Sequence, residues 1–244
     1  MHETPKNSIE FRLWGRYALF TDPLTKIGGE KCSYHIPTYE ALKGVCKSVY
    51  WKPTIVWVVD EVRVMKRIRT QTKGTKPLEF GGGNTLAIYT FLSDVEYQIR
   101  AHFEWNQNQK NLDSDHIDGK HFSIANRMLE KGGRQDIFLG TRDCQGYVEP
   151  WLFGEGEGAY DKDEEIGYGL MFHGFGYPDE TGKNVLTARF WRPMMRKGII
   201  QFVRPDECPE NLCKIVRTMT AKSFGIDENV RPVTLEAEEL GVTE

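Results

Sequence analysis

The chain has 244 residues, of which 39% are hydrophobic, and a formal net charge of −3. It contains no run of about 18 apolar residues that would span a membrane, and its first residues lack the apolar segment of a signal peptide. The five cysteines are scattered and form no Cys-x-x-Cys pair, which predicts a reduced, cytoplasmic protein without a metal site or another cofactor.

The acidic residues are concentrated in two segments. Residues 149–165 carry a net charge of −6 and residues 227–244 one of −5, which leaves +8 on the rest of the chain. Within that rest, residues 60–77 hold a basic stripe formed by Arg63, Lys66, Arg67, Arg69, Lys73 and Lys76. Such a stripe suits a nucleic-acid phosphate backbone, although a solvated basic hairpin is the commoner explanation of a run of charges.

The first part of the chain predicts two strands with a helix between them. Residues 8–20 are rich in aromatic and branched side chains, which favours a strand. A helix is expected from Pro37 to about Tyr50, where Pro53 ends it, with a buried stripe of Leu42, Val45, Cys46 and Val49. Residues 54–66 predict a second long strand.

The middle of the chain predicts a basic loop and a hairpin. Residues 67–84 are interpreted as a loop that ends in Gly81-Gly82-Gly83-Asn84. Residues 85–92 and 95–105 are expected to pair around Ser93-Asp94, which is a typical turn sequence.

A second helix and a returning strand follow. Residues 106–118 predict a polar loop, residues 120–131 a helix that ends at Gly132-Gly133, and residues 136–149 a strand. The order of elements is that of the split βαβ arrangement. Residues 1–150 therefore predict a ferredoxin-like domain in an α+β protein.

The composition changes after residue 150, where glycine and acidic residues become frequent. Short strands are expected near 168–175, 185–192 and 198–204. We interpret residues 151–226 as a smaller C-terminal portion made of an antiparallel β-sheet. Residues 227–244 are expected to be a loose acidic tail.

Gly119-Lys120-His121 stands at the predicted start of the second helix, where free backbone N–H groups and the helix dipole favour a phosphate. Lys120 adds a positive charge to offset that of a phosphorane. His121 adds a group that exchanges protons near neutral pH, and the helix dipole is expected to lower its pKa. These residues would suffice to cleave RNA without a metal ion. A plain helix start, with His121 half-buried beside Ile124, explains the same pattern.

Tyr50 is the second candidate, near the end of the first helix. Its ordinary pKa of about 10 makes the phenol a poor free base, so positioning or proton donation is expected of it. An amphipathic tyrosine at the edge of the core is the alternative, and the sequence alone does not bring Tyr50 to His121. Gly81, Gly82 and Gly83 lack the Lys-Ser/Thr of a P-loop and are expected to permit close approach of a ligand.

Several longer strings are more specific than these patterns. They are Tyr17-Ala-Leu-Phe-Thr-Asp-Pro-Leu-Thr-Lys-Ile-Gly-Gly-Glu-Lys31, Pro37-Thr-Tyr-Glu-Ala-Leu-Lys-Gly44, Tyr50-Trp-Lys-Pro53, Gly81-Gly-Gly-Asn-Thr-Leu86, Gly119-Lys-His121, Asp136-Ile-Phe-Leu-Gly140, Cys144-Gln-Gly-Tyr147 and Tyr177-Pro-Asp-Glu-Thr-Gly182. In this order they resemble the CRISPR-associated Cas-five family, type I-C (Dvulg subtype), over roughly residues 8–210.

The resemblance implies a RAMP-type protein, with an N-terminal ferredoxin-like (RRM-like) domain and a C-terminal β-sheet portion. The type I-C branch of the family resembles a dedicated repeat-RNA processor. Its active site combines the Tyr of Tyr-Trp-Lys-Pro with an adjacent Lys-His pair. Tyr50, Lys120 and His121 occupy these positions here, so the resemblance implies that they are the catalytic residues.

On this basis we expect a metal-independent endoribonuclease that cuts CRISPR precursor RNA at the 3′ base of each repeat hairpin. A ribose 2′-OH would attack, leaving a 2′,3′-cyclic phosphate and a 5′-OH. The basic stripe and Gly81, Gly82 and Gly83 would bind the RNA. The protein would then keep the mature crRNA in the type I-C surveillance complex, with its backbone and large subunits. A non-catalytic RNA-binding scaffold is the main alternative, and general binding of duplex DNA is a third.

Overall fold

Alternation of apolar and polar residues builds the central strands. The structure, a computed structural model, describes residues 7–117 and 119–242. In β1 (Ser8–Ala18) every second side chain over most of the strand is buried, which is the period of a strand with one face on the core. Strand β1 pairs with β4 (Ala87–Trp105) and β6 (Gln145–Pro150), and β4 also pairs with β2 (Ile55–Val64).

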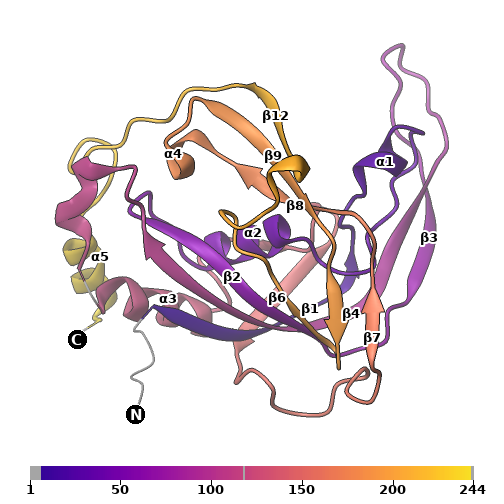
Figure 1. The fold of residues 1–244 in the computed structure, drawn as a ribbon, viewed down its shortest axis with the longest axis horizontal. Coiled ribbons are helices and arrows are strands. Elements are labelled where there is room, and N and C mark those ends of the chain that lie inside the picture. Colours follow the sequence, from indigo (N-terminus) through magenta and orange to yellow (C-terminus); the bar gives the residue numbers. More distant parts are fainter. Residues whose placement is uncertain (1–6, 118, 243–244) are drawn as a thin grey trace.

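Two helices pack against these strands (Figure 1). Helix α2 (Tyr39–Val49) lies on β2, and α3 (Lys120–Glu130) lies on β1 and β6. The Thr38 side chain caps α2 by accepting the N–H of Ala41. The chain order β1-α2-β2-β4-α3-β6 is the βαββαβ order of a ferredoxin-like domain. The predicted α+β fold is confirmed, and both main helices lie where the sequence predicts them.

The C-terminal half adds strands to this sheet and forms a second one. Beyond β2 the sheet continues through β11 (Ile199–Gln201), β10 (Met194–Arg196) and β7 (Glu165–Gly167), while β5 (Ile137–Phe138) lies beyond β6. The second sheet has three strands: β8 (Met171–Gly176), β9 (Val185–Trp191) and β12 (Cys213–Thr218). The short helical elements are α1 (Pro23–Lys26), α4 (Pro178–Thr181) and the 3-10 turns Lys110–Asp115 and Glu210–Leu212. None of the described helices is long and apolar enough to cross a membrane.

Strand β4 is continuous over 19 residues, so the expected hairpin around Ser93-Asp94 is wrong. Its pairing with β1 continues on both sides of this dipeptide, from Tyr17 opposite Ser93 to Gly15 opposite Val95. Asp94 has a φ of +53°, a left-handed conformation that Asp tolerates better than most residues. The turn-forming residues therefore kink a long strand instead of reversing the chain.

The segment 67–84 is only partly a loop, because β3 (Thr70–Thr75) lies within it and pairs with residues 87–92 of β4. Both faces of β3 are largely exposed, so the sequence shows no apolar period there. The two strands form a hairpin that projects from the body at the upper right of Figure 1. Its tip exposes Leu78 and Phe80.

The acidic segment 227–244 contains helix α5 (Val233–Leu240), so the expectation of a loose tail is not met there. Val233 and Ala237, one turn apart, are both buried in the core, and α5 packs on α3. Two buried apolar positions in an eight-residue helix give too short a pattern to predict from sequence. The position of α5 next to α3 places it beside the site described below (Figure 1).

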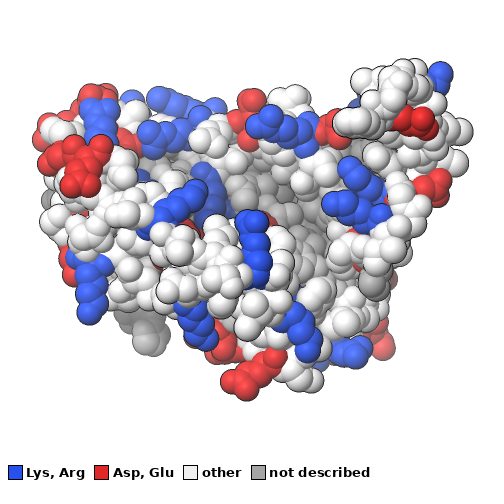
Figure 2. All heavy atoms as spheres, turned by 90° about the horizontal axis from the view of Figure 1, so that it is seen from above, with Lys and Arg blue, Asp and Glu red and all other residues white. Residues whose placement is uncertain are grey.

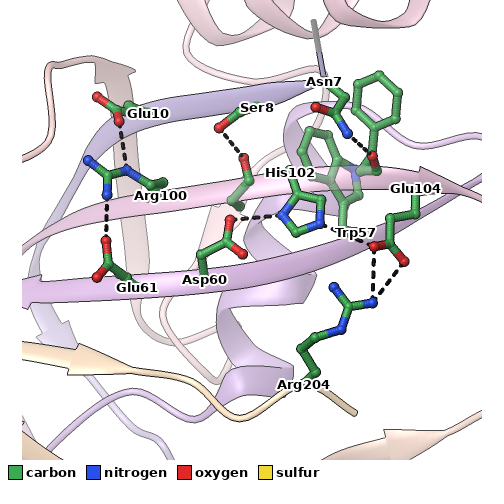
Figure 3. A network of polar contacts seen from close by, with 12 residues as sticks. Asn7, Ser8, Glu10, Trp57, Asp60, Glu61, Arg100, His102, Glu104 and Arg204 are labelled. Atoms are coloured by element: carbon green, nitrogen blue, oxygen red, sulfur yellow. Dashed lines mark hydrogen bonds and ion pairs between the residues drawn. The ribbon is translucent and has the colours of Figure 1, made fainter. Parts of the chain in front are cut away.

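Residues of the central strands that do not enter the core carry charges that pair across strands (Figure 3). Arg100 of β4 lies 2.8 Å from Glu10 of β1 and 2.6 Å from Glu61 of β2. His102 of β4 lies 2.9 Å from Asp60, and this hydrogen bond raises the pKa of His102. These cross-strand pairs tie the three strands together.

Candidate active site

Tyr50 ends helix α2 and has an extended backbone conformation. Its N–H donates to the carbonyl of Cys46, and its carbonyl accepts a hydrogen bond from the indole Nε1 of Trp57 at 2.7 Å. Its main chain is thus held from both α2 and β2. These contacts fix the direction in which the phenol ring leaves the chain.

His121 lies in the first turn of α3. Gly119 precedes it with a φ of +80°, a left-handed conformation that favours glycine and turns the chain into the helix. The hydroxyl Oη of Tyr50 lies 2.9 Å from Nδ1 of His121. The fold therefore brings together two candidates that are 71 residues apart in the sequence.

The second ring nitrogen of His121 defines the tautomer. Nε2 lies 2.8 Å from the main-chain carbonyl of Asp115, which only accepts hydrogen bonds. Nε2 therefore carries a proton, and Nδ1 of the neutral ring accepts the hydrogen bond that Tyr50 donates. This leaves Nδ1 as the basic atom and points it at the Tyr50 hydroxyl.

Burial sets the protonation states of this pair. The side chains of Tyr50 and His121 are both 0% exposed. Burial lowers the pKa of His121 and raises the pKa of Tyr50, because each charged form loses its hydration. Near pH 7 the imidazole is neutral and the phenol keeps its proton. The direction of the His121 shift agrees with the prediction, but burial rather than the helix dipole is its main cause.

Aromatic rings enclose the imidazole. The ring of Trp105 lies edge-on to His121 at 5.3 Å between centroids, and that of Phe103 lies at 6.2 Å. Trp105 is itself stacked on His116 at 4.7 Å. This apolar surround excludes water from His121 and is the physical origin of its lowered pKa.

Asp115 is a buried carboxylate behind the imidazole. Its Oδ1 accepts the backbone N–H of Val233 at 2.6 Å, and its Oδ2 accepts the hydroxyl of Thr54 at 2.9 Å. Oδ2 also lies 3.3 Å from Nζ of Lys52 and 3.8 Å from Nε2 of His121. These contacts fix the backbone whose carbonyl selects the His121 tautomer. Among the described residues, no group of three His, Cys, Asp or Glu side chains is arranged to hold a metal ion.

The amine that joins this network is Lys52 and not Lys120. Lys52 is buried, donates to the carbonyl of Arg231, and lies 3.6 Å from Oε2 of Glu236 as well as near Asp115. The Lys120 side chain is half-buried and forms no ion pair with any residue that the structure describes. Lys120 is thus close to His121 along the chain but outside its hydrogen-bonded network.

An open cleft of about 670 Å³ lies beside the buried pair. Trp51 and Lys52 line it from the segment that follows Tyr50, and Arg134 lines it from the turn that follows α3. The C-terminal segment contributes Phe224 and Glu236. Trp51 is 37% exposed and faces Phe224, with 6.2 Å between ring centroids. The cleft combines positive charge with aromatic faces, the two features that bind single-stranded nucleic acid.

Comparison with known proteins identifies the family. The Cas5d model of the family described as CRISPR-associated protein (Cas_Cas5) matches residues 8–203. The chain belongs to the Cas5 family. It is 41% identical over 225 residues to a Mannheimia succiniciproducens protein named CRISPR pre-crRNA endoribonuclease Cas5d, with 80% of this chain and 94% of that protein covered. A Thermus thermophilus protein of the same name is 26% identical over 195 residues, covering 76% of this chain and 80% of that protein.

Solved structures of similar chains have the same fold. A crystal structure described as a CRISPR-associated protein aligns with a TM-score of 0.71 and 34% identity, covering 85% of this chain and 97% of that one. A protein of Streptococcus mutans, SMU1763c, described as functionally uncharacterized, aligns with a TM-score of 0.68 and 37% identity, covering 82% and 94%. The ferredoxin-like core of this Cas5 family member is therefore shared with solved relatives.

One residue of the predicted basic stripe, Arg63, is buried inside the protein. Arg63 is only 6% exposed; its guanidinium contacts Asp161 at 2.8 Å and donates to the carbonyls of Glu155 and Gly156. A buried, fully bonded guanidinium is a structural element. Arg63 is therefore removed from the RNA-binding set, which is a correction to the sequence analysis.

The rest of the stripe lies at the surface. Lys66 pairs with Asp94 and Arg67 with Asp163, while Lys73 lies over the ring of Tyr17. The remaining predicted RNA-binding residues are exposed: Arg69, Lys76, Gly81, Gly82 and Gly83, the last four on the tip of the β3–β4 hairpin. On the face in Figure 2, Lys and Arg side chains are spread around a hollow between the body and this hairpin.

Lys52, Asp115 and Glu236 were not predicted as site residues from the sequence. Lys52 stands in the Tyr50-Trp-Lys-Pro53 string, which is the one signal that pointed to it. Asp115 and Glu236 stand in polar segments without a pattern, and only the tertiary fold brings them to the site. Glu236 also lies beyond residue 203, where the match to the Cas5 family ends.

Proposed function

We propose that this Cas5 family member cuts CRISPR precursor RNA at the 3′ base of each repeat hairpin, by attack of a ribose 2′-OH and without a metal ion. The observation that carries the proposal is the 2.9 Å hydrogen bond between Tyr50 and His121, two residues of the strings that resemble the family. The names of the two curated relatives, both CRISPR pre-crRNA endoribonucleases, support the same activity.

The geometry suggests a path for the proton. The 2′-OH gives its proton to Oη of Tyr50 while Tyr50 gives its own proton to Nδ1 of His121. Burial raises the pKa of Tyr50, so the phenol keeps its proton near pH 7 and releases it to His121 as it takes the proton of the 2′-OH. The 2′ oxygen forms a bond to phosphorus as the 5′ oxygen leaves and takes up a proton from water, which yields a 2′,3′-cyclic phosphate and a 5′-OH. His121 then returns its extra proton to solvent through Tyr50, which restores the starting pair. Lys120, at the positive end of α3, offsets charge on the phosphorane.

Neither side chain of this pair is exposed, so RNA reaches Tyr50 and His121 only if residues that bury them move. The cleft that contains Trp51 and Lys52 is the natural entry, since both residues directly follow Tyr50. The exposed basic residues of the hairpin would hold the repeat stem through its phosphates, reading shape more than sequence. Duplex DNA offers the same phosphates and would bind there with little sequence preference.

After cutting, the protein keeps the 5′ handle of the crRNA and joins the backbone and large subunits of the type I-C surveillance complex. A single 5′-handle subunit would sit at one end of such an assembly. Pull-down of the other subunits with and without crRNA tests this part of the proposal. Assembly that needs neither this protein nor its bound RNA would contradict it.

The activity itself is tested by incubating purified wild-type protein with the cognate repeat RNA in EDTA. The proposal predicts one cut per repeat and a product that ends in a cyclic phosphate. Loss of cutting in EDTA with rescue by Mg²⁺ would contradict the metal-independent mechanism. Tight binding without any cut would instead favour the non-catalytic scaffold.

A further inference from the structure

Glu236 is a buried carboxylate held between two cations beside the Tyr50–His121 pair. It is 7% exposed; its Oε2 lies 3.6 Å from Nζ of Lys52, and its Oε1 lies 2.5 Å from Nη1 of Arg134. A buried anion is stable only when opposite charges replace its lost hydration. Lys52 and Arg134 supply that replacement, so together they form a site for one negative group.

Lys52 and Arg134 both lie within residues 8–203, the part of the chain that matches the Cas5 family. Lys52 follows Tyr50 by two residues, and its second carboxylate partner is Asp115, which supports His121. The backbone N–H of Arg134 donates to the carbonyls of Ser48 and Val49 in the last turn of α2, which attaches the end of α3 to the end of α2. The pair Lys52–Arg134 is therefore built by the same helix ends that carry the candidate catalytic pair.

The anion comes from a different part of the chain. Glu236 belongs to α5, which lies beyond residue 203, the end of the match to the Cas5 family. The segment that leads to α5 is held at the cleft by the hydrogen bond from Asn111 to the carbonyl of Phe224 and the one from Lys52 to that of Arg231. Lys52 and Arg134 thus lie in the part of the chain that matches the family. Glu236 lies in a C-terminal segment that packs against that part.

A phosphodiester has the charge and the oxygen acceptors to take the place of this carboxylate. The planar guanidinium of Arg134 can donate two parallel hydrogen bonds to phosphate oxygens, and the Lys52 amine adds a point charge. Both line the open cleft, where Trp51 offers an exposed ring on which a neighbouring base can stack. An RNA strand that enters the cleft toward Tyr50 passes both cations.

We propose that Lys52 and Arg134 bind a phosphate of the substrate RNA next to the cleaved bond, and that Glu236 occupies this site as a substitute anion in the free protein. The inference rests on the proposed function, because it names the substrate group that the same site takes. RNA and Glu236 then compete for one pair of cations. Removing the carboxylate favours RNA, and removing a cation disfavours it.

The test measures the affinity for cognate repeat RNA made with 2′-deoxyriboses along its 3′ half, which no 2′-OH attack can cut there. Wild type is compared with Glu236→Gln and Glu236→Ala. The control is Glu238→Gln, which makes the same charge change at an exposed position of α5. Loss of the competing anion should tighten binding by about threefold or more for both Glu236 variants and by less than about twofold for the control.

Arg134→Gln tests the cation side. It should weaken binding by roughly tenfold, as expected when a charge-assisted hydrogen bond to phosphate is lost, and Arg134→Lys should recover part of the affinity. In the double variant Arg134→Gln/Glu236→Gln, the gain from removing the carboxylate should shrink, because the two side chains act through one contact. Thermal unfolding of each variant identifies any that fail to fold.

The two proposals fail in different ways. If folded Glu236→Gln and Glu236→Ala bind this RNA no tighter than wild type, Glu236 is not a substitute for phosphate and the inference is overturned. Unchanged affinity of folded Arg134→Gln overturns it as well. If wild type does not cut the all-ribose repeat but the Glu236 and Arg134 variants behave as expected, the phosphate site stands and the nuclease proposal fails.

Discussion

The hydroxyl of Tyr50 is the side-chain group that binds Nδ1 of His121, and in the proposed mechanism it lies between the imidazole and the RNA. The imidazole has no free nitrogen, because Nε2 binds the Asp115 carbonyl and Nδ1 binds Tyr50. Any proton that His121 takes from a substrate therefore passes through the phenol. Residue types and matching strings predicted Tyr50, Lys120 and His121, but only the fold shows which of them touch.

Tyr50→Phe should slow cleavage by about 10²-fold or more, since it removes a positioned proton-transfer group and leaves the ring in place. The rate is measured under single-turnover conditions in EDTA. Tyr39→Phe is the matched control, because Tyr39 is another buried tyrosine of α2, whose hydroxyl reaches the carbonyl of Trp57. Equal rates for wild type and Tyr50→Phe would remove the phenol from the mechanism.

The pH dependence of cleavage should follow the neutral form of His121. Burial lowers the pKa of this imidazole below its usual 6.5, so the base is present at neutral pH and is lost only as the pH falls through the lowered pKa. The single-turnover rate should thus be flat around pH 7 and decline on the acid side, with a midpoint below 6.5. A midpoint above 7 would show that His121 is not the buried base described here.

At the scale of elements, the fold separates what local pattern can predict from what it cannot. Helices α2 and α3 have a regular buried stripe, and β1 alternates over most of its length, so the sequence predicts all three. Strand β4 was predicted as a hairpin because Ser93-Asp94 has the composition of a turn. Helix α5 was not predicted, because its burial depends on tertiary contacts. Its two buried apolar residues, Val233 and Ala237, are too few to give a helical pattern in the sequence.

The same limit explains Arg63. Its neighbours in the sequence are basic, but its guanidinium is bonded to a segment almost one hundred residues away, at Asp161. Arg63→Met should lower the free energy of unfolding by about 2–4 kcal/mol, because Asp161 and two carbonyls lose their donor. Arg67→Met, which breaks an exposed pair with Asp163, should cost much less stability than Arg63→Met. Urea denaturation compares the two, and equal losses would contradict the structural role of Arg63.

A second stability prediction concerns the charge pairs of the sheet in Figure 3. The hydrogen bond to Asp60 raises the folded-state pKa of His102 above its unfolded value. Its contribution to stability is therefore fully present below about pH 6.5 and is lost as the pH rises through the raised pKa. The loss of unfolding free energy in His102→Gln should be larger at pH 5.5 than at pH 8.5. A loss that is the same at both values would contradict this pairing.

At the scale of the whole molecule, one continuous sheet joins the catalytic candidates to the surfaces that would hold RNA. The β3–β4 hairpin extends from the same strand β4 that contributes Phe103 and Trp105 to the surround of His121. The C-terminal strand β11 pairs with β2, so the two halves of the chain share the sheet. Strand pairings between residues this far apart in the sequence cannot be predicted from local periodicity. The sequence therefore predicted individual helices and strands but not how the strands join into one sheet.

The exposed basic residues at the β3–β4 hairpin are predicted to contribute to the salt dependence of RNA binding. Arg69 and Lys76 are exposed, and each contact with a phosphate that they make in the RNA stem releases counterions. Arg69→Ala and Lys76→Ala should each lower the slope of log Kd against log salt by about 0.7–0.9. Lys162→Ala, at an exposed position of the acidic segment, is the control and should leave the slope unchanged. Unaltered slopes for both hairpin variants would place the RNA elsewhere.

The central claim is that the Tyr50–His121 pair cuts RNA rather than merely contacting it. The most direct measurement compares wild type with His121→Ala in EDTA, recording binding of the cognate repeat RNA and its single-turnover cleavage in the same samples. The account predicts similar affinity for the two proteins and loss of cleavage in the variant alone. Cleavage by folded His121→Ala at the wild-type rate would contradict it.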